Sequence, residues 1–281
     1  MHSQFPPRCA DATAIEIVAK GRYEAPNAPD GFERLQYRSA VDGYEDWVLI
    51  RNPRRMSRWL VVLHGHNASG DQLLTRPDIR KRWWPMLGDM SMGVVLPNLR
   101  GNAWMGPAAQ MDLAGLLHWL HTNHGTKQVI LVGGSMGGTG TLTFTANHPQ
   151  DVAAAVALCP ATDVGDYHQW CRHGCATSPL LCEIADAIEW SYGGTPAKVP
   201  TAYEGDNVRK NHQKLVMPLA IVHGTADETI PVDQSRLLAE RLRGRATFQY
   251  HEIQGGDHNA PLQHFPQALA WCIDALEANT P

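Results

Sequence analysis

The sequence predicts an α/β fold in which a mostly parallel central sheet is flanked by helices on both faces. Two observations predict it. Short apolar, strand-like runs alternate along the chain with segments of helical periodicity. One of these runs, at 129–132, also ends in Gly-Gly-Ser-Met-Gly-Gly at 133–138, directly before a plausible helix. A strand that turns at once into a helix is typical of a parallel sheet covered by helices.

The elements follow in a regular order. Strands at 33–40 and 45–50 form an opening hairpin, because Asp42-Gly43 between them is a turn signal. Prolines at 77 and 85 interrupt the helical pattern at 73–87, so we expect a poorly regular crossover there. The other expected strands are 58–63, 93–96, 129–132, 152–158, a run that starts at 219, and 247–253. The other expected helices are 112–121, 180–190 and 265–276.

Length and composition favour one globular domain over 1–281. The chain has 281 residues and a mass of 31.0 kDa, with 43% hydrophobic and 19% charged residues. A net charge of −4 gives no reason to expect nucleic acid or an anionic membrane as a partner. No apolar run is long enough to span a bilayer. Residues 1–8 contain two prolines and no apolar signal segment, so we expect a cytoplasmic location.

The motif at 133–137 matches Gly-x-Ser-x-Gly, the pattern of a nucleophile elbow. Glycines flank Ser135 because the turn is strained and a Cβ would collide with neighbouring backbone. The following helix directs its N-terminal N–H groups toward the serine. A phosphate-binding loop would need Gly-Lys-Ser/Thr, and a dinucleotide site would need Gly-x-Gly-x-x-Gly, and neither pattern is present.

A serine hydroxyl needs a base and a carboxylate to act as a nucleophile at neutral pH, and both follow in the chain. Asp227 comes at the carboxyl end of the strand that starts at 219, and His258 follows the strand at 247–253. We predict that His258 takes the proton of Ser135 and that Asp227 orients His258. The backbone N–H groups of His66 and Met136 are predicted to bind the oxyanion.

Two other carboxylates are alternatives for the acid role. Asp163 follows the strand at 152–158, and Asp257 precedes His258 directly. Asp257 is expected to shape its loop, since its side chain should point away from the site. Asp227 has the better context, at a strand end with Pro231 closing the turn.

These motifs resemble the α/β-hydrolase superfamily, and within it the small esterases and the catalytic domains of prolyl-oligopeptidase-type serine hydrolases. The resemblance extends from about residue 58 to the C-terminus. It implies a serine carboxylic ester hydrolase that needs no cofactor and no metal and acts on a small-molecule ester. Oligopeptidase relatives carry a large N-terminal propeller. Because fewer than 60 residues precede the first core strand, we expect no propeller here. The segments that carry the resemblance are 63–66, 97–102, 133–138, 192–196, 223–227 and 256–258.

The segment 159–216 is expected to form a cap or lid over the site, as insertions at this point of the superfamily do. Trp104 and Met105, in the loop after the strand at 93–96, are candidates for the substrate pocket. Aromatic side chains of the cap are expected either to line that pocket or to form the cap's own core. These are Tyr167, Trp170, Trp190 and Tyr192.

Three cysteines lie close together in this segment, at 171, 175 and 182. Free buried thiols are the default for a cytosolic chain, whereas a disulfide would fit an exported one. The His and Cys spacing matches no known structural zinc motif. The sequence leaves the choice between thiols and a disulfide open.

We predict cleavage of short-chain, acetyl or aryl esters through an acyl-enzyme. Amide hydrolysis of the oligopeptidase type is the alternative, since the same fold and triad perform it. A non-catalytic binding module is disfavoured because no member of the triad is missing.

Overall fold

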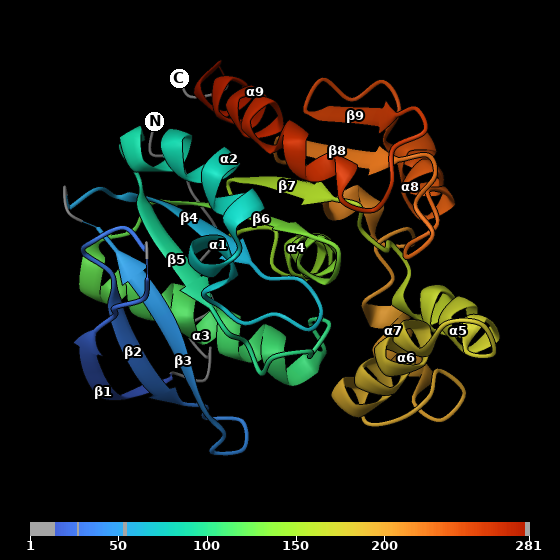
Figure 1. Ribbon diagram of the computed structural model, residues 1–281, viewed down its shortest axis with the longest axis horizontal. Helices are drawn as coiled ribbons and strands as arrows, with labels where there is room; N and C mark the ends of the chain where they lie inside the picture. The colour runs from blue at the N-terminus through green and yellow to red at the C-terminus, as the bar shows by residue number, and fades with distance from the viewer. Residues whose placement is uncertain (1–14, 27, 53–54, 279–281) are drawn as a thin grey trace, which may run out of the picture.

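A central sheet organises the protein (Figure 1). The computed structural model describes residues 15–26, 28–52 and 55–278, and within them nine strands form one sheet in the order β1-β2-β3-β5-β4-β6-β7-β8-β9. The pairings among β1, β2, β3 and β5 are antiparallel, and all pairings from β5 through β4 to β9 are parallel. The expected mostly parallel sheet is therefore confirmed. The strands are β1 Glu16–Arg22, β2 Glu33–Arg38, β3 Glu45–Arg51, β4 Arg58–Leu63, β5 Gly93–Pro97, β6 Gln128–Gly134, β7 Ala154–Leu158, β8 Leu219–Gly224 and β9 Phe248–Ile253.

The central strands are buried on both faces. In β4, Val61 and Leu63 belong to one hydrophobic cluster, whereas Leu60 and Val62 belong to the other. The same alternation holds along β6, β7 and β8, because successive side chains of a strand point to opposite faces. Strands buried on both faces have continuous apolar sequences, which is why the sequence identified them.

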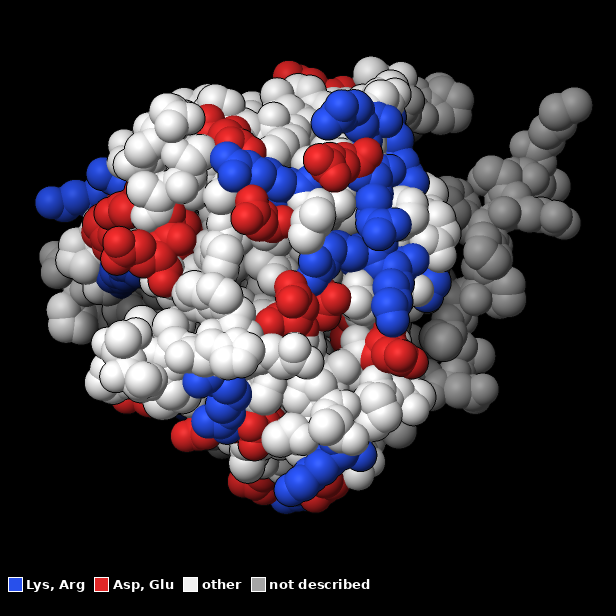
Figure 2. Space-filling model, turned by 90° about the vertical axis from the view of Figure 1, so that its right-hand side faces the viewer, with Lys and Arg blue, Asp and Glu red and all other residues white. Residues whose placement is uncertain are grey.

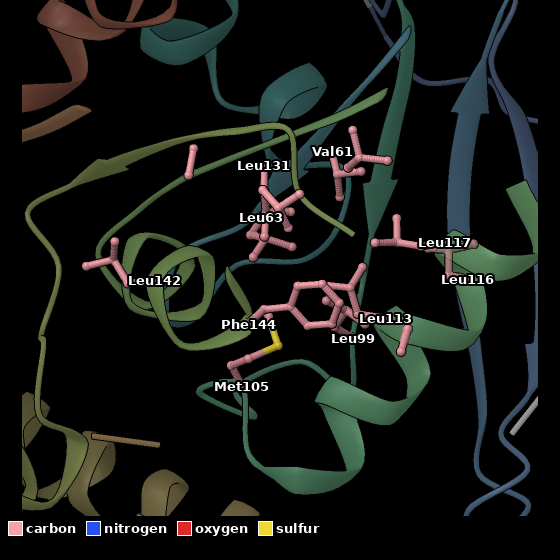
Figure 3. Packing of buried hydrophobic residues seen from close by; sticks show 14 of the residues in the cluster. Val61, Leu63, Leu99, Met105, Leu113, Leu116, Leu117, Leu131, Leu142 and Phe144 are labelled. Carbon is pink, nitrogen blue, oxygen red and sulfur yellow. The ribbon is translucent and has the colours of Figure 1, made fainter. Parts of the chain in front are cut away.

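Helices cover both faces of the sheet. Helices α3, α4 and α8 contribute to the first cluster, and α1, α2 and α9 to the second. Figure 3 shows part of the first cluster, where Leu63 of β4 and Leu131 of β6 lie near Phe144 of α4. The helices are α1 Gln72–Thr75, α2 Pro77–Asp89, α3 Pro107–His124, α4 Met136–Asn147, α5 Val164–Gly174, α6 Pro179–Tyr192, α7 Pro200–Gly205, α8 Asp233–Leu242 and α9 Phe265–Ala278, with 3₁₀ turns η1 His212–Lys214 and η2 Ala260–His264.

Along the chain, helices α5, α6 and α7 come between β7 and β8. In space they form a separate group at the lower right of Figure 1. We call this group the α5–α7 insertion. Its core includes Tyr167, Ile188 and Tyr192 and extends to Met136 at the start of α4. The insertion thus packs onto the part of the sheet edge where the predicted elbow lies.

Several elements differ from the sequence expectation, and α8, which was not predicted, is one of them. Pro85 lies inside α2 and does not end it, whereas Pro77 begins the helix. Burial of Ile79 and Trp83 against the sheet offsets the cost of an internal proline. Strand β1 was not predicted, because its side chains are mostly exposed and show no alternation. The insertion also contains α5 and α7 besides the expected helix at 180–190.

The surface of the insertion side carries mixed charge (Figure 2). Acidic and basic side chains lie next to one another over much of this face. Many are paired between neighbouring elements, as Arg236 of α8 is with Glu252 of β9 at 2.8 Å. Exposed pairs of this kind contribute little to stability, about 0.2–1 kcal/mol each.

No helix in the described part of the chain is long and apolar enough to cross a membrane. The expectation about residues 1–8 concerns residues outside that part.

Candidate active site

Ser135 lies on the sharp turn between β6 and α4. Its backbone has φ 59° and ψ −123°, in a region that a residue with a side chain rarely occupies. The turn is tight because a Cβ on Gly137 would lie 2.3 Å from the carbonyl oxygen of Leu63, and one on Gly133 2.4 Å from the carbonyl carbon of Gly137. Backbone packing therefore holds Ser135 at the sheet edge, with the N-terminus of α4 beside it.

Asp227 and His258 meet beyond the carboxyl ends of β8 and β9. His258 Nδ1 lies 2.7 Å from Asp227 Oδ2 and donates to it. Asp227 Oδ1 accepts the backbone N–H groups of Thr229 at 2.8 Å and Ile230 at 2.9 Å. The carboxylate is thus fixed at both oxygens. Because Nδ1 carries the proton, Nε2 of His258 is the atom that can accept one.

A second histidine, His223 at the end of β8, also reaches Asp227. It is fully buried, and its Nε2 lies 2.9 Å from the carbonyl oxygen of Ile230 and 3.2 Å from Asp227 Oδ2. Its Nδ1 lies 2.7 Å from Ser235 Oγ. Since a carbonyl only accepts, Nε2 carries the proton and also points at Asp227. Sequence reasoning missed this role, although the spacing of four in His-Gly-Thr-Ala-Asp was visible.

The pKa values of Asp227 and His258 are shifted in opposite directions. Burial alone would raise the pKa of Asp227, but hydrogen bonds from His223 and His258 outweigh it and hold that pKa well below its usual range. Burial alone would lower the pKa of His258, but the Cys159 thiol and the Asp227 carboxylate beside the ring outweigh it, so that pKa is raised. The carboxylate is therefore charged at neutral pH and favours the imidazolium form.

The predicted oxyanion donors lie on two turns next to Ser135. In the described part of the chain, no group accepts a hydrogen bond from the backbone N–H of His66 or of Met136. The turn that carries His66 is fixed by the bond from Asn67 N–H to Asn102 Oδ1 at 2.8 Å. Both N–H groups are thus available for a ligand, as an oxyanion site requires.

A cavity of about 300 Å³ opens at Ser135. Ser135 and His258 line it together, and Ser135 Oγ has no hydrogen bond to any described residue. Free enzymes often hold such groups slightly apart until substrate binds. The apolar wall of the cavity comes from two sides, with Leu73, Ile79, Trp83 and Leu262 on one and Leu180 and Ile184 of α6 on the other.

Comparison with known proteins bears on the fold of the chain. The family described as "alpha/beta hydrolase fold" matches residues 58–177. The chain has the α/β-hydrolase fold. It is 26% identical over 206 residues to a monoacylglycerol lipase of Mycolicibacterium smegmatis, a match that covers 59% of this chain and 69% of that protein.

Solved structures share this fold. An esterase of Pyrococcus furiosus has a TM-score of 0.62 at 17% identity, with 88% of this chain and 90% of that one covered. An S-formylglutathione hydrolase of Agrobacterium tumefaciens has a TM-score of 0.65 at 13% identity, with 93% and 99% covered. A puromycin-hydrolyzing peptidase of Mycobacterium tuberculosis has a TM-score of 0.61 at 17% identity, with 83% and 38% covered. At these identities the likeness concerns the fold.

The two expected pocket residues do not line the cavity at Ser135. Trp104 is 1% and Met105 6% exposed, and both border a second, smaller cavity beside Met136. Trp104 Nε1 instead donates to His66 Nδ1 at 3.2 Å. Burial lowers the pKa of His66, so its ring is neutral and accepts this bond. A direct role of Trp104 and Met105 in substrate binding stays a prediction.

The aromatic side chains of the insertion mostly form its own core. Tyr167 and Tyr192 are buried there, and Trp170 packs against them. Trp190 is 65% exposed. None of these four lines the cavity at Ser135.

The remaining acidic candidates and the cysteines have clear structural positions. Asp163 caps α5 by accepting the N–H of Asp166, and Asp257 accepts the N–H groups of two residues in its own loop. Of the alternatives left open, the structure shows a disulfide between Cys175 and Cys182, with Cys171 free and buried.

Cys159, which the sequence did not single out, lies directly beside the candidate site. It follows β7, it is buried, and its Sγ lies 3.3 Å from the carbonyl oxygen of His258. Only the tertiary structure brings it there, since 99 residues separate the two.

Proposed function

We propose that this protein cleaves small carboxylic esters through an acyl-enzyme on Ser135. The observation that carries the proposal is the Asp227–His258 hydrogen bond at 2.7 Å beside a cavity that His258 shares with Ser135. A serine on an elbow, a base and a buried carboxylate are the groups that nucleophilic acyl transfer needs.

The reaction follows from these positions. Ser135 Oγ attacks the ester carbonyl carbon while Nε2 of His258 takes its proton, and Asp227 stabilises the imidazolium that forms. The N–H groups of His66 and Met136 bind the oxyanion, each contributing about 3–4 kcal/mol to the transition state. The proton then passes to the departing alcohol. Water, activated by His258, releases the acid and restores Ser135.

The cavity supports a small substrate. Its volume of about 300 Å³ is at the lower end of the usual range for ligand pockets, about 300–1,000 Å³. Its apolar side, near Ile79 and Trp83, suits a short acyl or aryl group. Leu180 and Ile184 reach the cavity from α6, so we propose that the insertion, within 159–216, acts as a cap that limits substrate size.

Hydrolysis of p-nitrophenyl esters from acetate to decanoate tests this proposal. We expect turnover to fall steeply beyond butyrate, and we expect Ser135→Ala to lower kcat by about 10⁴–10⁶-fold without unfolding the protein. Aminoacyl anilides, assayed in parallel, test the alternative of amide hydrolysis. Turnover of anilides but of no ester would replace the proposal by that alternative. Ester turnover retained in Ser135→Ala would remove Ser135 from the mechanism.

A further inference from the structure

Three side chains of types that can bind a metal ion lie together beside the Ser135 cavity, and two of them, Cys159 and His258, line it. Cys159, Asp227 and His258 each offer one ligand atom, and these three atoms lie within 4.8 Å of one another. Cys159 and Asp227 are buried and His258 is partly exposed. Ester hydrolysis uses the carboxylate and the imidazole but gives the thiol no task.

The backbone fixes Cys159 in this place. Strand β7 lies between β6 and β8, so the residue after β7 lies between the strand ends that lead to Ser135 and Asp227. Ser135 N–H donates to the oxygen of Leu158, and Cys159 N–H donates to the oxygen of Val222 at 2.8 Å. The thiol is therefore held beside the pair by main-chain bonds on both sides.

We propose that Cys159, Asp227 and His258 form an inhibitory binding site for a borderline-soft divalent cation, with Zn²⁺ as the best match. Thiolate, imidazole and carboxylate are the three ligand types of protein zinc sites. Magnesium and calcium prefer sites made only of oxygen atoms, so they fit this set poorly.

Small shifts fit the three ligand atoms to a tetrahedral ion. Zinc bonds of about 2.0–2.3 Å place ligand atoms about 3.3–3.8 Å apart. Asp227 Oδ2 and His258 Nδ1, which are 2.7 Å apart, have to separate by about 1 Å, and any pair near the 4.8 Å upper limit has to approach by about 1 Å. Ser135, Cys159 and His258 all line the cavity, which gives the ion a path in and leaves a fourth position for water.

The N–H groups of Thr229 and Ile230 hold Asp227 Oδ1 and orient the carboxylate. Oδ2 accepts the Nδ1–H of His258 in the metal-free protein, and the ion would replace that hydrogen bond.

Binding would stop hydrolysis. The S–H bond of Cys159 breaks, its proton passes to solvent, and a zinc–sulfur bond forms. The proton on Nδ1 of His258 moves to Nε2, and the lone pair freed on Nδ1 binds the ion in place of the hydrogen bond to Asp227 Oδ2. Nε2 then carries a proton and cannot act as base for Ser135. This consequence rests on the proposed function, whereas zinc binding itself does not.

The test compares zinc binding with zinc inhibition in the full chain, purified without a metal-binding tag. Calorimetry measures Zn²⁺ affinity and stoichiometry, and hydrolysis of p-nitrophenyl acetate measures the inhibition constant relative to each variant's own rate without zinc. The test variants are Cys159→Ala and Cys159→Ser, the second of which preserves the volume if the first fails to fold. Two matched controls are used. Cys272→Ala removes a buried thiol elsewhere, and His264→Ala removes a member of the surface pair His251–His264, whose rings lie 4.9 Å apart.

We expect one zinc ion per chain and inhibition by Zn²⁺ but not by Mg²⁺. Both Cys159 variants should lose about tenfold or more in zinc affinity, because even changes to residues around the ligands lower metal affinity by about 10–100-fold. The two controls should keep the affinity of the original chain. Cobalt(II) in place of zinc should give a thiolate charge-transfer absorption that Cys159→Ser lacks.

Unchanged zinc affinity in the Cys159 variants, or its loss in His264→Ala, would overturn the proposal. The two proposals fail separately. Cys159-dependent zinc binding in a chain that hydrolyses no ester would remove the proposed function and keep the site. Ester hydrolysis without Cys159-dependent binding would do the reverse.

Discussion

The carboxyl edge of the sheet and the α5–α7 insertion are built in different ways. At the edge, main-chain atoms touch directly, and a Cβ on Gly133 or Gly137 would lie within 2.4 Å of backbone. In the insertion, side chains such as Tyr167 and Ile188 make a small core, and surface ion pairs such as Arg172–Glu189, at 2.6 Å, join its helices. The edge holds the groups proposed for the chemistry, and the insertion reaches the cavity only with side chains of α6.

This difference suggests a division of roles. Groups that must be placed to a fraction of an ångström lie on backbone that cannot shift, and the residues that set substrate size lie on a helix that tolerates substitution. Changes at the edge should therefore alter the rate for every substrate, and changes in the insertion should alter the choice among substrates.

The largest effect after loss of Ser135 itself is expected for Asp227→Asn. The amide cannot stabilise the imidazolium and favours the wrong tautomer of His258, so kcat should fall by about 10³–10⁴-fold for all esters. Steady-state kinetics with p-nitrophenyl acetate and butyrate measure this. Asp163→Asn is the matched control, because Asp163 follows the neighbouring strand β7 but caps α5 and makes no hydrogen bond to His258. A larger loss of kcat in Asp163→Asn than in Asp227→Asn would mean that Asp163, and not Asp227, has the acid role.

The pH dependence of kcat/KM tests the same pair. His258 acts as a base only when neutral, so activity should rise with pH. Because the pKa of His258 is raised, the rise should lie above the ordinary histidine value. Asp227→Asn removes one cause of that shift, so the residual activity should rise at lower pH. A rise at the same pH in both proteins would contradict the interaction between the two groups.

A smaller effect is expected at His223. His223→Leu removes the N–H that faces Asp227 Oδ2. Loss of a hydrogen bond to a charged group costs about 1.5–3 kcal/mol. We expect about 1.4 kcal/mol of this loss to fall on the transition state, which lowers kcat about tenfold. Without this N–H, the Asp227 carboxylate interacts more strongly with His258 and raises the pKa of His258 further. The rise of activity should therefore move to higher pH. His223→Gln, which can restore a donor at the Nε2 position, should recover both values. A drop in thermal stability with an unchanged pH profile would mean that His223 is only structural.

The smallest effect is expected in the insertion. Leu180→Ala opens the cavity wall on α6, and because Leu180 is 41% exposed, stability should change little. We expect a ratio of decanoate to acetate hydrolysis raised by a few-fold, with the acetate rate nearly constant. Leu237→Ala, at a residue that is 43% exposed on α8 and away from the cavity, is the control. An equal change in both variants would mean that α6 does not set substrate size.

Much of the sheet edge at Ser135 was predictable from the sequence because most of its physical causes are local. Strands buried on both faces need continuous apolar runs, and Gly133 is required within the turn itself, because a Cβ there would lie 2.4 Å from the carbonyl carbon of Gly137. Asp227 and His258 were found because parallel strands bring their carboxyl ends to one edge, which makes the order along the chain informative.

The sequence by itself therefore determined the fold class, the elbow and the three residues of the predicted triad. Only the tertiary structure decided that His223 supports Asp227, that Cys159 lies beside His258, and that Leu180 rather than Trp104 reaches the large cavity. The physical reason is range. Steric and periodic constraints act between neighbours in the chain, whereas these contacts depend on how strands and helices pack across the sheet and on which side chains the packing buries.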